Sequence, residues 1–318
     1  MRDGNAGQGR DYALSEVIGF ILLLGILVTA FALWMVYVVP VNGRVAEITQ
    51  MNTVKDQFTN YKISLDSLWI NSPYGASWNQ NSVTVSTSID LGTGGGDTQA
   101  SGLFLPMMNP IPSSATLSIL NTSDTLNVTY SGPSGTNTLT YPLTILQYQS
   151  QNNYWIQQTY YYEDGGVFLT QLNGSVCRVA PPISFVNANS VYLVEITPIT
   201  LNGIGSMGGN GPVRVDSRLM TLAPPATGAE YWVNTSVTVS NYTAAQMWLG
   251  VFNTSRSNGG ILDARNYTFG ISPVSAIPGS AFMNITGPSS GVLTPDVNMA
   301  IQPAQYAVTL NSIVSNLD

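Results

Sequence analysis

The feature of this 318-residue chain that most constrains its fold is an unbroken apolar stretch near the N-terminus. From Val17 to Val41 the residues are aliphatic or aromatic, and Thr29 is the only short polar side chain. At about 1.5 Å per residue this stretch makes a helix of roughly 37 Å, enough to cross a hydrocarbon core of about 30 Å with some tilt. A secretory signal has a shorter apolar core and small residues at its exit. The stretch therefore predicts a membrane anchor that the protein keeps.

A short polar leader precedes this stretch, and the acid Glu16 lies directly before its first residue. The order is a polar leader, then Ser15-Glu16-Val17-Ile18-Gly19, then Phe20-Ile21-Leu22-Leu23-Leu24. It resembles the N-terminus of archaeal type IV pilin-like proteins, and residues 41–71 also look like large members of that group. The resemblance covers about residues 10–70 and leaves residues 75–318 without a family. It implies a class III signal peptide, a prepilin peptidase as processing partner, and a retained helix that packs in a filament core.

The resemblance also implies where the leader ends. Glu is the fifth mature residue in that family, so Glu16 places the cut between Asp11 and Tyr12. The family has a basic residue and a small Gly or Ala before the cut, and Asp11 is neither. The chain then divides into a cytoplasmic leader at 1–11, a transmembrane helix at 12–41, an amphipathic helix or stalk at 42–72, and an extracellular domain at 73–318. The alternative is an uncleaved single-pass anchor with a short cytoplasmic tail.

The sequence supports two interpretations of Glu16, which lies at the start of the apolar stretch. A carboxylate at the bilayer edge is costly when unpaired, and the first turn of a helix favours negative charge. In pilins the matching acid is thought to pair with the free N-terminal amine of a neighbouring subunit, which implies an assembly role for Glu16. The alternative is that Glu16 only completes the start of a helix whose first hydroxyl is Ser15.

The helical pattern continues beyond the membrane stretch. Apolar residues recur every three or four positions between polar ones such as Arg44 and Glu47, at Val45, Ile48, Met51, Val54, Phe58, Tyr61, Leu65 and Leu68. Pro40 removes a backbone hydrogen bond, so we expect a kink or a loosened turn at the junction, which Gly43 weakens further. The apolar stripe must dock on a surface, either the head of its own chain or another copy in a coiled coil.

The composition changes sharply after Pro73. The rest of the chain is rich in Ser, Thr, Asn, Gly and Pro, and its β-branched and aromatic residues fall in thirteen short runs, among them Tyr154–Tyr162 and Met247–Phe252. Glycine-rich turns separate these runs, and no helical period of useful length is evident. The expected fold class is α+β: a long N-terminal helix followed by a mainly antiparallel β-sandwich-like head. One large domain or two subdomains, divided near Pro181-Pro182 or Pro224-Pro225, fit equally well.

The head surface is poor in charge but rich in sites for attached sugar. Charged residues make up only 8% of the chain, so solubility depends on hydroxyls, amides or attached groups. Eight N-x-S/T sequons lie in the head, which makes glycosylation a prediction. Cys177 is the only cysteine, which excludes an intrachain disulfide and a Cys-built zinc site. The sequon asparagines are Asn121, Asn127, Asn173, Asn234, Asn241, Asn253, Asn266 and Asn284.

The absence of histidine and the scattered positions of the acids narrow the range of functions that we expect. The chain has no histidine, so the commonest general base and metal ligand is unavailable, and we expect no enzyme activity and no cofactor. A carboxylate-pair glycosidase would have to use Glu163, Glu195, Asp216 or Glu230, which no spacing brings together. The net charge of −7 disfavours nucleic acid as a partner. Taken with these features, the resemblance implies an archaeal cell-surface protein of pilin-like construction, a minor pilin or adhesin that associates with itself or other pilins. The alternative is a non-polymerising anchored module that binds carbohydrate or cell envelope.

Overall fold

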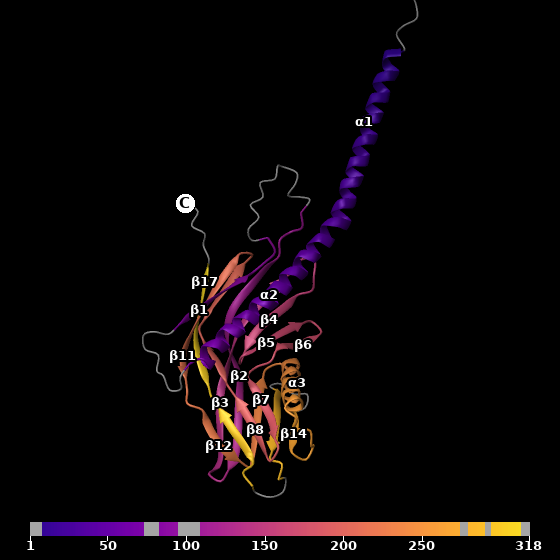
Figure 1. Ribbon diagram of the computed structural model, residues 1–318. Helices are drawn as coiled ribbons and strands as arrows, with labels where there is room; N and C mark the ends of the chain where they lie inside the picture. Colours follow the sequence, from indigo (N-terminus) through magenta and orange to yellow (C-terminus); the bar gives the residue numbers. More distant parts are fainter. Residues whose placement is uncertain (1–7, 73–82, 95–108, 274–278, 290–293, 313–318) are drawn as a thin grey trace, which may run out of the picture.

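A single long helix and a β-rich head make up the protein. The computed structural model describes residues 8–72, 83–94, 109–273, 279–289 and 294–312, with only the backbone at 8–15. Helix α1 (Gln8–Leu33) projects away from the head, and α2 (Val39–Ile70) continues it along the β-structure (Figure 1). Between them lies a short π-helix, η1 (Trp34–Val38). The α+β layout predicted from the sequence is therefore present.

The π-helix lies next to Pro40, where the sequence predicts a loosened turn. The Val39 N–H donates to the carbonyl of Trp34, five residues back instead of four. Proline has no N–H to donate and its ring crowds the carbonyl four residues earlier. One widened turn before Pro40 relieves that crowding without breaking the helix.

The central element of the head is a nine-stranded sheet. Its two longest strands, β2 (Ser114–Gly132) and β3 (Gly135–Gln151), form one hairpin that runs through much of the head (Figure 1). On the β2 side follow β13, β15 and β14, on the β3 side β4, β5 and β6, and β10 pairs with the first part of β2. The bounds are β4 Gln158–Glu163, β5 Gly166–Gln171, β6 Gly174–Val179, β10 Gly205–Gly209, β13 Trp232–Val239, β14 Tyr267–Ser272 and β15 Gly279–Thr286.

Two four-stranded sheets flank the large one. The first has the order β1-β11-β17-β9 and the second β12-β16-β8-β7. Their strands are β1 Thr84–Asp90, β7 Ile183–Ala188, β8 Val191–Ile196, β9 Ile199–Asn202, β11 Pro212–Leu222, β12 Ala226–Glu230, β16 Val297–Ile301 and β17 Ala304–Ser312. Only the pairs β17·β9 and β16·β8 are parallel among the described strands, so the head is mainly antiparallel.

A hydrophobic core lies on each face of the large sheet. Side chains alternate between the faces of a strand, and in β4 Tyr160 and Tyr162 join one core while Tyr161 joins the other. The first core contains α2 and the sheet β1-β11-β17-β9, and the second contains helix α3 (Tyr242–Asn258) and the sheet β12-β16-β8-β7. Both cores take residues from before and after Pro181-Pro182 and Pro224-Pro225. Neither proline pair divides one core from the other.

Helix α3 (Tyr242–Asn258) corrects the reading of Met247–Phe252 as a strand and of the head as free of helix. The Asn241 side chain accepts the N–H of Thr243 at 2.9 Å and caps its N-terminus. Ala245, Trp248 and Phe252 are fully buried at helical spacing. The run Met247–Phe252 looks like a strand in the sequence because its residues are apolar almost without interruption. The polar positions that would reveal a helical period are missing from it.

Candidate functional site

The N-terminal helix is uncovered over its apolar part. Every side chain from Glu16 to Tyr37 is exposed, and this is the one helix, within the described residues, that is long and apolar enough to cross a membrane. Such a surface is stable only in an apolar environment. Glu16 lies near its start. The backbone is helical through Asp11 and Tyr12, but their side chains lie outside the described residues, as does most of the leader.

Helix α2 docks on the head of its own chain. Gln57 and Asp90 of β1 exchange two hydrogen bonds, with the Gln57 Nε2 donating to Asp90 Oδ2 at 2.8 Å and the Asp90 N–H donating back at 3.2 Å. The hydroxyl of Tyr306 on β17 donates to the carbonyl of Leu65 at 2.8 Å. Phe58, Tyr61 and Leu65 are fully buried between these contacts. The stripe predicted from Met51 onward is therefore covered within the chain.

The N-terminal end of that stripe, before Met51, differs from the prediction. Val45 is 58% exposed, whereas Glu47, expected on the polar side, is 1% exposed. The Glu47 carboxylate accepts the backbone N–H groups of Asn153 at 2.6 Å and Tyr154 at 2.9 Å in the β3–β4 loop (residues 152–157). Two N–H donors compensate the burial of this charge. The loop is thereby tied to the helix just beyond the apolar stretch.

The other aromatic residues of the predicted Tyr154–Tyr162 run have separate places. The Tyr154 ring lies against Gly43, where any side chain would overlap it. The Arg44 guanidinium lies 4.3 Å from the centre of the Trp155 ring. The strand itself begins only at Gln158, and its three tyrosines are core residues.

One face of the large sheet carries an open polar surface on β14, β15, β13, β2 and β3. Its residues are half-buried or exposed, while their neighbours along each strand, such as Val233 and Ile285, are fully buried on the other face. Hydroxyl and amide side chains on neighbouring strands form hydrogen bonds with one another. For example, Thr140 Oγ1 on β3 donates to Asn127 Oδ1 on β2 at 2.8 Å. We call this surface the polar face; one row across it is Thr268, Asn284, Asn234, Thr129 and Thr138.

A shallow hollow of about 360 Å³ lies on the polar face. The Oδ1 atoms of Asn234 and Asn284 are buried in the sheet without a hydrogen-bond partner among the described residues. Two aromatic residues, Trp232 and Phe282, line the hollow together with Thr268 and Thr286. The aromatic rings and the hydroxyl groups that line this hollow suit a ligand that carries hydroxyl groups and apolar C–H faces.

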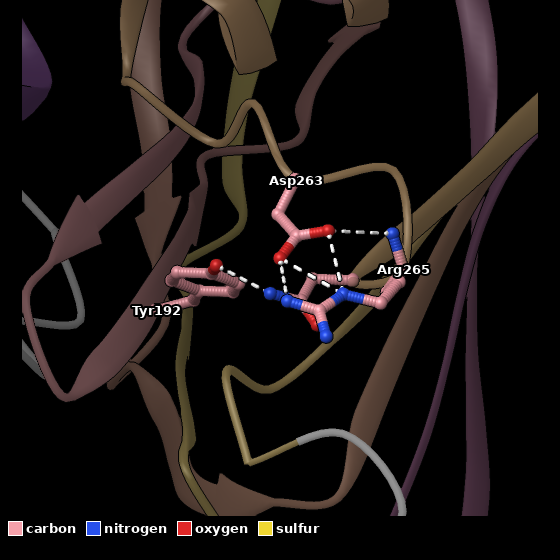
Figure 2. Close-up of polar contacts among 4 residues, drawn as sticks. Tyr192, Asp263 and Arg265 are labelled. Carbon is pink, nitrogen blue, oxygen red and sulfur yellow. Dashed lines mark hydrogen bonds and ion pairs between the residues drawn. The ribbon is translucent and has the colours of Figure 1, made fainter.

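The sequon asparagines differ in access. Asn121, Asn173 and Asn241 are exposed; Asn127, Asn234 and Asn284 lie on the polar face; and Asn253 accepts hydrogen bonds from Arg256. Asn266 is only 4% exposed, and its Nδ2 donates to the hydroxyl of Tyr192 at 2.8 Å. Just before it along the chain, Arg265 and Asp263 form an ion pair at 2.6 Å (Figure 2), and the hydrogen bonds from Arg265 lower the pKa of Asp263 to about 2.

A larger hollow of about 810 Å³ lies between α3 and the edge strands β6 and β7. Its lining includes Met247, Val251, Phe185 and the half-buried Cys177. Burial raises the pKa of the Cys177 thiol to about 11, so the thiolate that acts as nucleophile or metal ligand is scarce at neutral pH. Apolar side chains therefore form part of the lining of this hollow, and its thiol is not activated as a nucleophile.

The acids considered for hydrolysis are dispersed over three sheets. Glu163 ends β4 in the core, Asp216 pairs with Arg214 on β11 at 3.1 Å, and Glu195 and Glu230 lie on β8 and β12. Burial raises the pKa of Glu163 to about 8, helped by the charge of Asp124 and opposed by the indole N–H of Trp248. Within the part of the chain that the structure describes, no three His, Cys, Asp or Glu side chains are grouped to hold a metal ion.

Comparison of the chain with protein-family models, curated proteins and solved structures finds no match. Function must therefore be inferred from the residues and their geometry.

Proposed function

We propose that this chain is a membrane-inserted archaeal cell-surface protein, a pilin-like subunit of a type IV pilus-like assembly, with its head outside the cell. The uncovered apolar helix that continues into a head-docked α2 carries the proposal. The Ser15-to-Gly19 sequence at its start adds the resemblance to prepilins. The size of the head favours a minor pilin or adhesin over a major subunit, with no enzyme activity.

Glu16 is the proposed assembly residue. Residues 17–43 contain no Lys or Arg, so the helix beyond Glu16 offers no cation to this exposed carboxylate. The free amine of a neighbouring subunit, exposed by prepilin peptidase after Asp11, would supply that charge at the membrane edge. Pairing there would set the stagger between subunits.

The first prediction follows from this pairing. Intact-mass analysis of the membrane-purified protein should give a mature N-terminus at Tyr12, and Glu16→Ala should abolish incorporation into sedimentable filaments. Membrane insertion should be unchanged, because a charge at the bilayer edge does not favour partition. Asp56→Ala, at a solvent-exposed position on α2, is the matched loss of one acid and should assemble normally. Met1 as the dominant N-terminus, or filaments of wild-type yield from Glu16→Ala, would reject the assembly role.

The polar face supports a second candidate function, a non-polymerising anchored module that binds neutral carbohydrate. Trp232 and Phe282 are on paired strands and four residues apart in register, about 13 Å at about 3.3 Å per residue. A short run of sugar rings fits in that span, between the two aromatic ends. Titration of the detergent-solubilised chain with cellohexaose should then give binding that Trp232→Ala weakens about tenfold. Phe269→Ala, on the other face of β14, is the control and should bind as wild type.

A further inference from the structure

We propose that the head has its own lipid contact, a collar of Ile111, Tyr154, Trp155 and Ile156 that rests on the outer surface of the membrane around the exit of the helix. This inference rests on the proposed membrane anchoring but not on filament formation. It gives the β3–β4 loop a role in lipid contact, which is separate from the membrane anchoring by the apolar stretch and from the packing of the core.

The distance along the helix places the collar at the membrane surface. No part of the head covers residues 16–37, whereas Val39 is 6% exposed and Gly43 and Glu47, one and two turns later, are buried. The 23 residues from Glu16 to Val38 span about 34 Å, close to the thickness of a hydrocarbon core of about 30 Å. The head therefore meets the helix at the level where the membrane must end.

Several side chains at that level are apolar or aromatic. Ile111 is 67% exposed and Ile156 is 49% exposed, and both come from loops of the head. The Ile111 N–H donates to the hydroxyl of Tyr154 at 3.1 Å, which joins the two loops into one surface. The buried Glu47 holds the backbone of Asn153 and Tyr154 against the helix. The collar is thus fixed relative to the helix axis.

Aromatic residues of helix and head meet at this level. Trp34 and Tyr37, both exposed, lie in the last turns before Val39, and Tyr154 and Trp155 lie just beyond it. Tyr and Trp are enriched at membrane–water interfaces, where one end of the ring is apolar and the other is wet. The Arg44 guanidinium over Trp155 adds a cation at the height of the lipid phosphates. These interfacial aromatic residues and the cation, at the level where the apolar stretch ends, favour lipid over a second copy as the occupant of the collar.

Depth measurements on the full chain in phosphatidylcholine–phosphatidylglycerol nanodiscs test the collar. Single cysteines in a Cys177→Ser background carry spin labels at Ile156→Cys, at Val28→Cys in the middle of the apolar stretch, and at Leu172→Cys on the β5–β6 turn, which is 99% exposed. Accessibility to oxygen is compared with accessibility to a water-soluble nickel chelate. We expect the labels at 156 and 28 to favour oxygen and the label at 172 to favour nickel, each by several-fold.

Each other outcome has a separate meaning. A label at 156 that is as open to nickel as that at 172, with 28 still protected, overturns the collar and leaves the anchor standing. A label at 28 that is open to nickel overturns the anchor itself. Dipolar broadening between labels at 156 in neighbouring copies would assign the surface to a protein interface and would also overturn the collar. Circular dichroism of each labelled chain confirms that the fold is kept.

Discussion

At the scale of single residues, the buried carboxyl of Glu163 has the clearest energetic consequence. It is 2% exposed, lies at the end of β4, and accepts the indole N–H of Trp248 at 3.3 Å. Its ordinary pKa is 4.5, and burial raises the folded pKa to about 8, with the charge of Asp124 adding to the effect. Between these values the folded state holds a proton that the unfolded state has lost. The free energy of unfolding must therefore fall as the pH rises from about 4.5 to 8.

Glu163→Gln tests this linkage. Glutamine keeps an acceptor for Trp248 and has no charge, so the variant should be more stable than wild type at pH 8, by on the order of 4 kcal/mol, and close to wild type at pH 5. Urea unfolding of the detergent-solubilised chain at both pH values measures the difference. Glu195→Gln, which removes an exposed acid from β8, is the control and should change neither value. A stability gap for Glu163→Gln that is independent of pH would contradict the raised pKa.

Access to the sequon asparagines leads to a prediction about glycosylation. Asn173 is exposed on the β5–β6 turn beside Leu172, which is 99% exposed, whereas the Nδ2 of Asn266 is engaged by Tyr192 inside the head. A glycosyltransferase that acts on the folded head can reach the first amide but not the second. Glycopeptide mass spectrometry of protein from a glycosylating archaeal host should find sugar at Asn173 and none at Asn266. Occupied Asn266 would mean that modification precedes folding, which sequon spacing alone does not reveal.

At the scale of elements, periodicity predicts the long helix well and α3 poorly. In α2, the residues from Met51 to Leu65 recur every three or four positions and are separated by polar ones. In α3, Met247, Trp248, Leu249, Val251 and Phe252 are nearly continuous and read equally well as a buried strand. The missed signal was Asn241, whose cap only the structure reveals. Glu47 was missed because its two donors come from a loop more than 100 residues away.

The cap of α3 can be separated from its sequon. Asn241→Ala removes both the cap and the sequon, and should destabilise the protein by about 1 kcal/mol. Thr243→Ala removes the sequon but keeps the backbone N–H that Asn241 accepts, so it is the matched control. Chemical denaturation of the two variants from a host that does not glycosylate should show a loss for Asn241→Ala alone. Equal losses would mean that the Thr243 side chain, and not the cap, matters.

At the scale of the whole molecule, the sequence predicts the division into helix and head but not the arrangement of the head. Alternating patterns identify most strands, yet β2 reads as two strands because Asn121–Asp124 interrupts its apolar alternation with polar residues at a register shift. The glycine-containing strands β10 and β12 have no pattern to detect. The polar face arises from register across five strands, which no local pattern encodes. Its hollow therefore could not be predicted, although each of its asparagines could be named as a sequon.

The placement of α2 makes a final prediction about which part of the chain folds alone. Phe58, Tyr61 and Leu65 are fully buried against β1, β4, β11 and β17, so the first core is incomplete without the helix. A fragment that begins at residue 75 exposes that apolar surface and should aggregate. One that begins at Gly43 keeps α2 and its Glu47 contact and should be soluble and monomeric, with a weak helical signal over a strong β-signal in circular dichroism. The control is the longer fragment with Phe58→Asp, which should aggregate as the short one does. A soluble, monomeric fragment 75–318 would contradict the view that α2 completes the core.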